Sequence, residues 1–258
     1  MKTLFRLLLI FWAGACLDAQ AQVDMLLDKN IFRARVSMID EFMSRFNMEE
    51  FAPTVNQSEP DARRMNLYSL VDFDYATSSD SVSNRVIGFA DAVLNHDIKL
   101  QFEDTAWCAI AKCVGKLNKK EVSFNLKLTT EHRGQGMYKW VIKDAEGMIF
   151  DLEPTVDLHT AMISPENHEI NFMALRRITE PANRKQIAAF AAHDCQVNPL
   201  AVFLALVYHG YLAIDGVDEL QFVFGQVPGY RFEVKYFNRQ SSNSGWLIHR
   251  ITRLNDSQ

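Results

Sequence analysis

Residues 122–129 read Val-Ser-Phe-Asn-Leu-Lys-Leu-Thr, and this stretch decides the fold class. Apolar and polar side chains alternate, so the two kinds face opposite sides, as in the half-buried strand of an antiparallel sheet. The mostly apolar stretch 107–114 precedes it, and the polar segment 116–121 between them is typical of a hairpin turn. Glycines within 134–136 mark a second turn, and we expect 137–142 to return as the next strand.

Helical patterns precede these strands. Apolar residues recur at three- and four-residue spacing over 31–46, which predicts a helix with one apolar face. A short helix is expected over 62–70, and the serine-rich stretch around Ser79 is typical of the N-terminal capping region of a third helix that ends at Asn95. Helices followed by an antiparallel meander are typical of the α+β class.

The second half repeats this order in a shorter form. A strand is predicted over 170–178 and a helix over 184–192. Asn198-Pro199 then opens a helix that reaches residue 212, and because apolar residues surround it almost completely, we expect it to be buried on most sides. Three further strands are predicted at 219–224, 230–237 and 246–251.

The two halves can be aligned with each other. Phe-Asn-Leu-Lys and Trp-Val-Ile within 124–142 correspond to Phe-Glu-Val-Lys and Trp-Leu-Ile within 232–248. We predict an internal repeat with domains at 22–154 and 155–258, in which the strands of each half pack beneath the helices of that half. Chance similarity between two amphipathic hairpins is the alternative.

Helices followed by a curved antiparallel sheet with a late Trp-x-Ile resemble the nuclear transport factor two-like (cystatin-like) α+β cone. The resemblance covers 31–142 and, more loosely, 170–254. The chain also resembles exported proteins of gut Bacteroidetes, through Ala-Gln-Ala-Gln at 19–22 and Arg45-Phe-Asn47. The resemblance implies helices packed on curved antiparallel sheets in two related cone-like halves. It does not fix the function, because the cone hosts enzymes, binders and dimerisation modules.

Residues 1–21 have the three parts of a signal peptide. A short cationic start precedes the apolar run 7–17, and Ala-Gln-Ala at 19–21 suits cleavage by a signal peptidase. The run is well short of the roughly 20 residues that cross a bilayer, so we expect no transmembrane segment in the mature chain. The expected location is periplasmic or secreted, and the alternative is a lipoprotein anchored at Cys16.

Composition narrows the possible partners. The chain is 48% hydrophobic, enough to bury a full core, and carries a net charge of −5 without a basic stripe. Such a protein is a poor nucleic-acid binder, because attraction to phosphate supplies most of that affinity. The glycines form no phosphate-binding loop and the histidines and cysteines lack metal-ligand spacing, so no cofactor or metal is expected.

Three cysteines follow the signal peptide. Cys108 and Cys113 fall in one predicted strand, about 16 Å apart at the usual rise per residue, which is too far for a disulfide between them. A disulfide would therefore join Cys195 to one of the two, and three reduced thiols are the alternative.

Cys195 is the best candidate nucleophile. It precedes a predicted helix whose N-terminal amides could stabilise a thiolate, and His193 and His209 lie nearby in the sequence, with His249 further away. This gives a cysteine-dependent hydrolase as an alternative function. The inward positions of the predicted strands hold no carboxylate, so an acid–base active site inside a cone is not expected and binding is favoured over catalysis.

Aromatic residues are the remaining lead. Tyr138, Trp140 and Trp246 occupy strand positions that a cone leaves partly open. Aromatic side chains beside polar neighbours line ligand pockets and interfaces. We therefore expect these three residues to bind a small apolar ligand, a glycan or another envelope protein.

Overall fold

The computed structural model describes residues 35–36, 39–53, 55–133, 138–151, 179–181, 187, 198–240 and 243–254. These form two compact units. Unit 1 comprises Met1–Ile110, Thr129–Val141 and Leu220–Gln258, and unit 2 comprises Ala111–Leu128 and Ile142–Glu219. The predicted boundary between residues 154 and 155, the strand 170–178 and the helix 184–192 lie outside the described residues and stay predictions.

The described elements are helices and one mostly antiparallel sheet. The helices are α2 (Ile39–Phe46), α3 (Ala62–Ser69), α4 (Phe73–Ala76), α5 (Asp80–Asn95) and α6 (Pro199–Tyr208). The strands are β1 (Arg35–Val36), β2 (Trp107–Leu117), β3 (Lys120–His132), β4 (Tyr138–Glu146), β5 (Leu212–Phe224), β6 (Tyr230–Phe237) and β7 (Ser244–Arg253). The strand order is β1-β7-β6-β5-β2-β3-β4. The predicted α+β class is confirmed.

A column of stacked aromatic rings forms the centre of unit 1. Phe46 of α2 stacks on Phe232 of β6 at 5.8 Å between ring centroids, with the ring planes only 3° apart. Phe232 stacks on Phe224 at 5.0 Å, and Phe224 stacks on Trp107 at 5.3 Å. All four side chains are buried. This aromatic column joins one helix to three strands.

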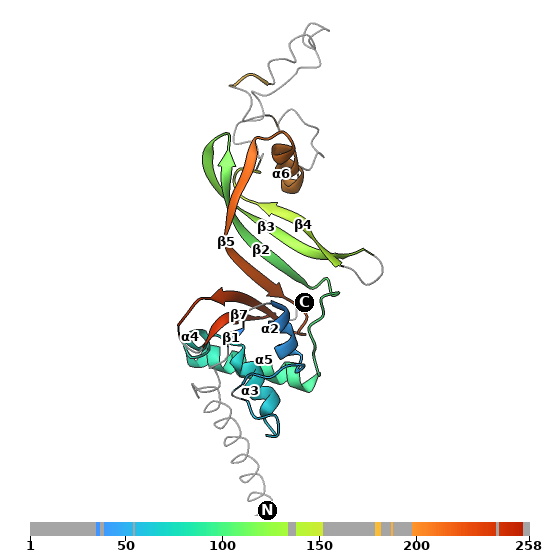
Figure 1. Ribbon diagram of the computed structural model, residues 1–258, viewed down its shortest axis with the longest axis vertical. Helices are drawn as coiled ribbons and strands as arrows, with labels where there is room; N and C mark the ends of the chain where they lie inside the picture. Colours follow the sequence, from blue (N-terminus) through green and yellow to red (C-terminus); the bar gives the residue numbers. More distant parts are fainter. Residues whose placement is uncertain are drawn as a thin grey trace, which may run out of the picture. The chain divides into compact units, whose positions relative to one another are not determined.

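The column corrects our expectation about how the halves pack. We expected the strands of each half to lie beneath the helices of that half, but Phe42 and Phe46 of α2 pack on Phe224 and Phe232. The N-terminal helices α2 and α5 therefore pack against the C-terminal strand β7, as Figure 1 shows. The two phenylalanines lie one helical turn apart, so both project from the same side of α2. There they pack on the flat aromatic rings of β5 and β6.

The helix predicted over 31–46 is wrong at residues 35–36, the only part of its first half that the structure describes. Helix α2 begins only at Ile39, and Arg35–Val36 forms strand β1, which pairs in parallel with Ser244 and Gly245 of β7. The edge of β7 offers backbone groups that need partners, and this long-range pairing overrides the helical pattern of the segment.

The β7 edge is closed beyond β1 as well. The amide of Ile248 donates to the carbonyl of Leu70 at 2.8 Å, and the amide of Asp72 donates to the carbonyl of Ile248 at 2.9 Å. Further along, the amide of Ile251 donates to the hydroxyl of Tyr75 at 2.8 Å. Edges covered in this way are protected from pairing with another chain.

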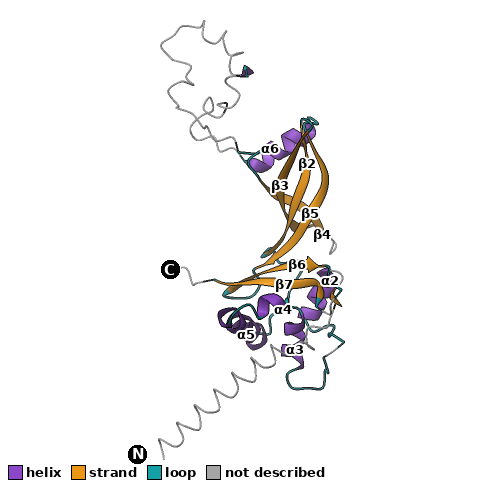
Figure 2. Ribbon diagram, turned by 90° about the vertical axis from the view of Figure 1, so that its left-hand side faces the viewer, coloured by secondary structure: helices purple, strands orange, loops and turns teal. Residues whose placement is uncertain are grey.

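Unit 2 packs α6 on its strands, as Figure 2 shows beside β2 and β3. Asn198 caps the helix by accepting a hydrogen bond from the amide of Leu200, and Phe203 packs against Phe124 and Phe150. Our expectation that this helix is buried on most sides is wrong. Phe203 is its only buried side chain, and Tyr208 is 85% exposed, because the strands cover a single face of the helix.

Two strands approach closely at Gly115 of β2. A Cβ atom at this position would lie 2.2 Å from the carbonyl oxygen of Ala213, on β5, so only glycine fits without moving the backbone. Gly216 lies in the same strand as Ala213, but a Cβ atom there would meet only Cγ2 of Val114, at 4.0 Å.

Replacement of Gly115→Ala should therefore lower the free energy of unfolding by about 3 kcal/mol, as overpacking against backbone does. The measurement is urea unfolding followed by circular dichroism. Gly216→Ala is the matched control and should change stability by less than about 1 kcal/mol. Equal effects of the two substitutions would contradict the close approach at Gly115.

A β-bulge places an ionisable cluster on β7. Glu233 of β6 pairs with Arg250 and Val234 pairs with Ile248, so His249 is the extra residue. Nε2 of His249 lies 3.7 Å from Oε2 of Glu233, and both side chains are largely buried. Burial, followed by the positive charge of Lys235, lowers the pKa of His249 below its ordinary value of 6.5, although the charge of Glu233 acts in the opposite direction.

The unfolded chain therefore binds a proton at His249 before the folded protein does. The free energy of unfolding should decrease as the pH falls below about 6.5, until the folded form is protonated too. His249→Gln should remove this part of the pH dependence, measured by urea unfolding at a series of pH values. His96→Gln, at the exposed C-terminal cap of α5, is the control for removal of a histidine as such. If His249→Gln left the pH dependence of the free energy of unfolding unchanged, His249 would not be the group responsible for it.

Candidate functional site

Five aromatic side chains from five strands meet in unit 1. They are Trp107, Trp140, Phe222, Tyr236 and Trp246, which together we call the aromatic surface. Trp140 meets Trp107 edge to face at 5.0 Å between centroids, and Trp246 meets Phe222 at 4.9 Å in the same manner. Tyr236 meets Trp246 at 5.5 Å. The predicted ligand residues Trp140 and Trp246 are thus connected through Phe222, whose ring lies 6.3 Å from that of Trp140.

Strand register explains why these residues share a face. Tyr236 lies opposite Trp246, and Phe222 lies opposite Val234. Directly paired residues of antiparallel strands project to the same side, and so do alternate residues along one strand. Phe232, Val234 and Tyr236 therefore point to one side of β6. The aromatic surface lies on the same sheet face that α2 covers elsewhere.

The surface has a buried floor and exposed rims. Trp107 and Phe222 are almost fully buried, whereas Trp140 and Tyr236 are each 42% exposed. Trp107 is held from behind by the aromatic column, and its indole N–H donates to the carbonyl of Phe102 at 3.2 Å. Rigid support lets exposed rings bind a ligand with little loss of side-chain entropy. The arrangement is suited to contact with an apolar or aromatic molecule.

Tyr138, the third predicted ligand residue, has different neighbours. It precedes Trp140 by two residues on β4, and its ring lies 5.1 Å from the ring of His132. Partial desolvation, followed by the negative charge of Glu103 and a hydrogen bond to it, raises the pKa of Tyr138. Tyr138 therefore adds a polar group near the aromatic surface. Its role in binding stays a prediction.

Three members of the aromatic surface were missed as site residues in the sequence. Phe222 and Tyr236 lie in segments that the alternation marks as strands, but alternation alone does not say which strands become neighbours. Trp107 is the first residue of β2. The sequence alone does not say whether a ring at the start of a strand is buried or partly exposed. The pairing of β5 with β6, and of β6 with β7, was the missing information.

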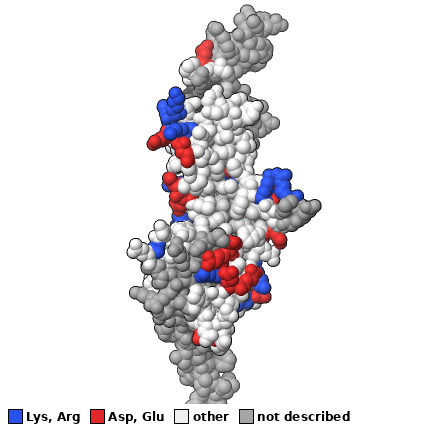
Figure 3. Space-filling model, viewed as in Figure 1, with Lys and Arg blue, Asp and Glu red and all other residues white. Residues whose placement is uncertain are grey.

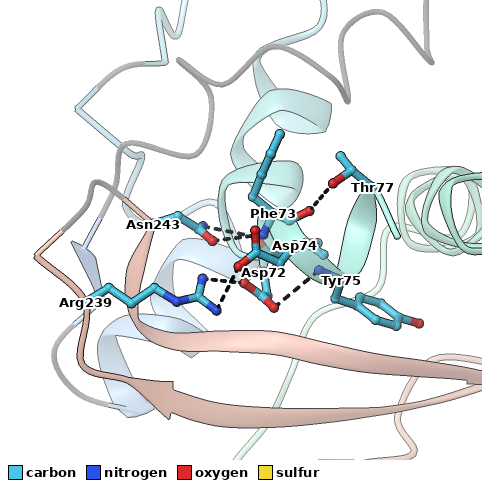
Figure 4. A network of polar contacts seen from close by, with 8 residues as sticks. Asp72, Phe73, Asp74, Tyr75, Thr77, Arg239 and Asn243 are labelled. Atoms are coloured by element: carbon cyan, nitrogen blue, oxygen red, sulfur yellow. Dashed lines mark hydrogen bonds and ion pairs between the residues drawn. The ribbon is translucent and has the colours of Figure 1, made fainter. Parts of the chain in front are cut away.

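A second polar cluster is structural. Figure 4 shows Arg239 reaching Asp72, with Nη1 and Oδ1 2.6 Å apart, and Asp74, with Nη2 and Oδ2 3.4 Å apart. Asn243 accepts a hydrogen bond from the amide of Phe73 at 2.9 Å. Asp72 also caps α4 through the amide of Tyr75. These contacts fasten α4 to the segment between β6 and β7.

Cys195 and His193 lie outside the described residues, as does any disulfide that involves Cys195. Cys108 and Cys113 both lie on β2 and form no disulfide with each other, as predicted. Burial raises the pKa of the Cys113 thiol, which favours its unreactive form.

The described residues hold no group of three or more His, Cys, Asp or Glu side chains able to bind a metal ion. Within the same residues, every helix is too short or too polar to cross a membrane. Comparison of the chain with protein-family models, with curated proteins and with solved structures finds no match to any of them. The geometry of the aromatic surface is therefore the basis for assigning a function.

Proposed function

We propose that this chain is a non-catalytic binding protein that holds a small apolar ligand on its aromatic surface. The observation that supports this most is the convergence of Trp107, Trp140 and Trp246, which come from distant parts of the sequence. Apolar contacts dominate the binding of small molecules, and aromatic rings with partly exposed edges supply them. A cysteine-dependent hydrolase centred on Cys195 is the competing function.

An apolar ligand agrees better with this surface than a glycan. Sugar recognition needs several hydrogen-bonding groups around an exposed ring, because each sugar hydroxyl that loses water requires a new partner. The five aromatic residues offer few such groups, and the indole N–H of Trp107 is already bound to a carbonyl. A glycan and an envelope protein are therefore the alternative partners, and their binding would be an alternative result of the test.

The proposal includes export and a finer description of the fold. Residues 1–21 would direct the chain to the periplasm or the exterior, or Cys16 would carry a lipid anchor. The cone-like, cystatin-like halves and the internal repeat are supported by two antiparallel hairpins, β3 with β4 and β6 with β7, that occupy corresponding positions in the aligned sequence. The repeat would then replace the homodimer that such folds often form.

Binding can be tested by calorimetric titration with three probes: palmitate, the naphthalene dye ANS and cellohexaose. The two apolar probes should bind the wild type, and Trp140→Ala should weaken their affinity about tenfold or more, as expected for an anchor residue. Trp140 is partly exposed, so its removal should leave the fold intact, which circular dichroism checks.

The matched control is Met148→Ala, which removes a still more exposed apolar side chain from unit 2. It should change the affinity for ANS by less than about twofold, because surface positions outside a site contribute little. Tight binding of cellohexaose alone would replace the apolar ligand by a glycan. The proposed ligand binding by the aromatic surface would be refuted if no probe bound, or if both variants lost affinity for ANS to the same extent.

Thiol labelling separates the proposal from the hydrolase. Native protein is treated with iodoacetamide at neutral pH, and the modified cysteines are identified by peptide mass analysis. We expect Cys195 to remain as unreactive as the buried thiol of Cys113, which is the internal reference. Rapid alkylation of Cys195 under these conditions would indicate an activated thiolate and favour the hydrolase with His193.

A further inference from the structure

Helix α6 and the turn that follows it leave an unusual amount of apolar surface in solvent. Leu204 is 53% exposed, Val207 42%, Tyr208 85% and Tyr211 53%. These four residues, which we call the α6 patch, lie within a stretch from 198 to 214 that contains no Asp, Glu, Lys or Arg. Soluble proteins rarely leave a contiguous apolar area of this kind uncovered without a partner.

Basic residues lie beside the α6 patch. The amide of Asn118, at the tip of the β2–β3 hairpin, donates to the carbonyl of Tyr211 at 2.9 Å, which holds the hairpin tip against the end of the patch. Lys119 and Lys120 extend from this tip and are exposed. Figure 3 shows the upper part of the described surface as largely uncharged, with basic and acidic side chains grouped together at its edge.

Acidic residues in the same region only partly balance these lysines. Asp215 is paired with Lys116, Nζ and Oδ2 being 3.4 Å apart, so this pair contributes little net charge. Glu121 follows Lys120 and is also exposed. At the hairpin tip two positive charges therefore face one negative charge.

We propose that the α6 patch docks on the surface of a lipid bilayer that contains anionic lipids. Leucine and valine side chains can enter the boundary between headgroups and acyl chains, and tyrosines favour this interfacial region. Lys119 and Lys120 would meet anionic headgroups beside the inserted helix. A ten-residue helix is far too short to span the bilayer, so the contact is peripheral.

The charges favour this occupant over a second copy of the chain. A two-fold symmetric contact through the α6 patch places the same surface on both partners, so an interface that includes both hairpin tips contains the exposed Lys119, Lys120 and Glu121 twice and carries a net positive charge. Like charges close to an interface oppose association, whereas an anionic surface attracts the same lysines. Charge complementarity therefore favours an anionic bilayer over a second copy of the chain as the partner of the α6 patch.

The test is co-sedimentation of the full chain with vesicles of phosphatidylcholine alone or of phosphatidylcholine mixed with phosphatidylglycerol. The wild type should bind the mixed vesicles, with weaker binding at high salt. Leu204→Glu and Tyr208→Ser should each lower the partition coefficient about tenfold or more, because they place a polar group where lipid is expected. Lys120→Glu should lower binding to the mixed vesicles at least about fivefold and leave binding to phosphatidylcholine alone unchanged.

Two controls keep this test separate from the ligand proposal. Leu254→Glu adds the same charge at an exposed leucine of unit 1 and should bind the mixed vesicles like the wild type. Trp140→Ala should do the same, so loss of ligand binding and loss of membrane binding would be independent. Light scattering without lipid gives the oligomeric state, which should be monomeric.

The proposal would be overturned if the wild type did not sediment with the mixed vesicles, or if Leu254→Glu and Leu204→Glu reduced binding equally. It would also be overturned if the protein were a dimer without lipid that Leu204→Glu converts to a monomer. That result would assign the α6 patch to a second copy of the chain.

Discussion

The stacked column of Phe46, Phe232, Phe224 and Trp107 is the contact on which unit 1 depends. It joins α2 to β6, β5 and β2, so the N-terminal helix and the C-terminal strands cannot fold independently. Burying each ring contributes on the order of 2 kcal/mol, and stacking adds a smaller term. The last ring of the column, Trp107, also supports Trp140. Core packing and the geometry of the aromatic surface are thus fixed by the same side chains.

This coupling explains the difference between the two exposed apolar areas. In unit 1 the rims of the aromatic surface rest on buried rings, so a ligand would meet side chains that are already ordered. In unit 2 the α6 patch consists mainly of aliphatic and tyrosine side chains on the outer part of a helix held through Phe203. A rigid aromatic surface suits a small molecule of defined shape. The aliphatic and tyrosine side chains of the α6 patch suit a lipid surface, because lipid molecules can rearrange around them.

Local features of the sequence predicted local structure well. Ser79 and Asn198 cap α5 and α6 as expected, and alternation located β3 and β6, because capping and strand periodicity depend on neighbouring residues. The failures concern distant partners. Arg35–Val36 became a strand because β7 supplied a partner, and α6 stayed exposed because only one face meets strands. For the same reason Trp140 and Trp246 could be chosen from the sequence, but Phe222 between them could not.

The use of buried polar groups supports binding as the function of unit 1. The amide of Asn66 is hydrogen-bonded to the backbone of Ala52, Arg45 and Glu50, and Asp72 is held by Arg239 while it caps α4. A catalytic acid, base or nucleophile must instead direct a proton or lone pair at a substrate. These groups are occupied with fastening loops and helix ends, and the preorganised side chains that reach solvent are aromatic. Such a surface can select a molecule by shape and apolar contact without transforming it.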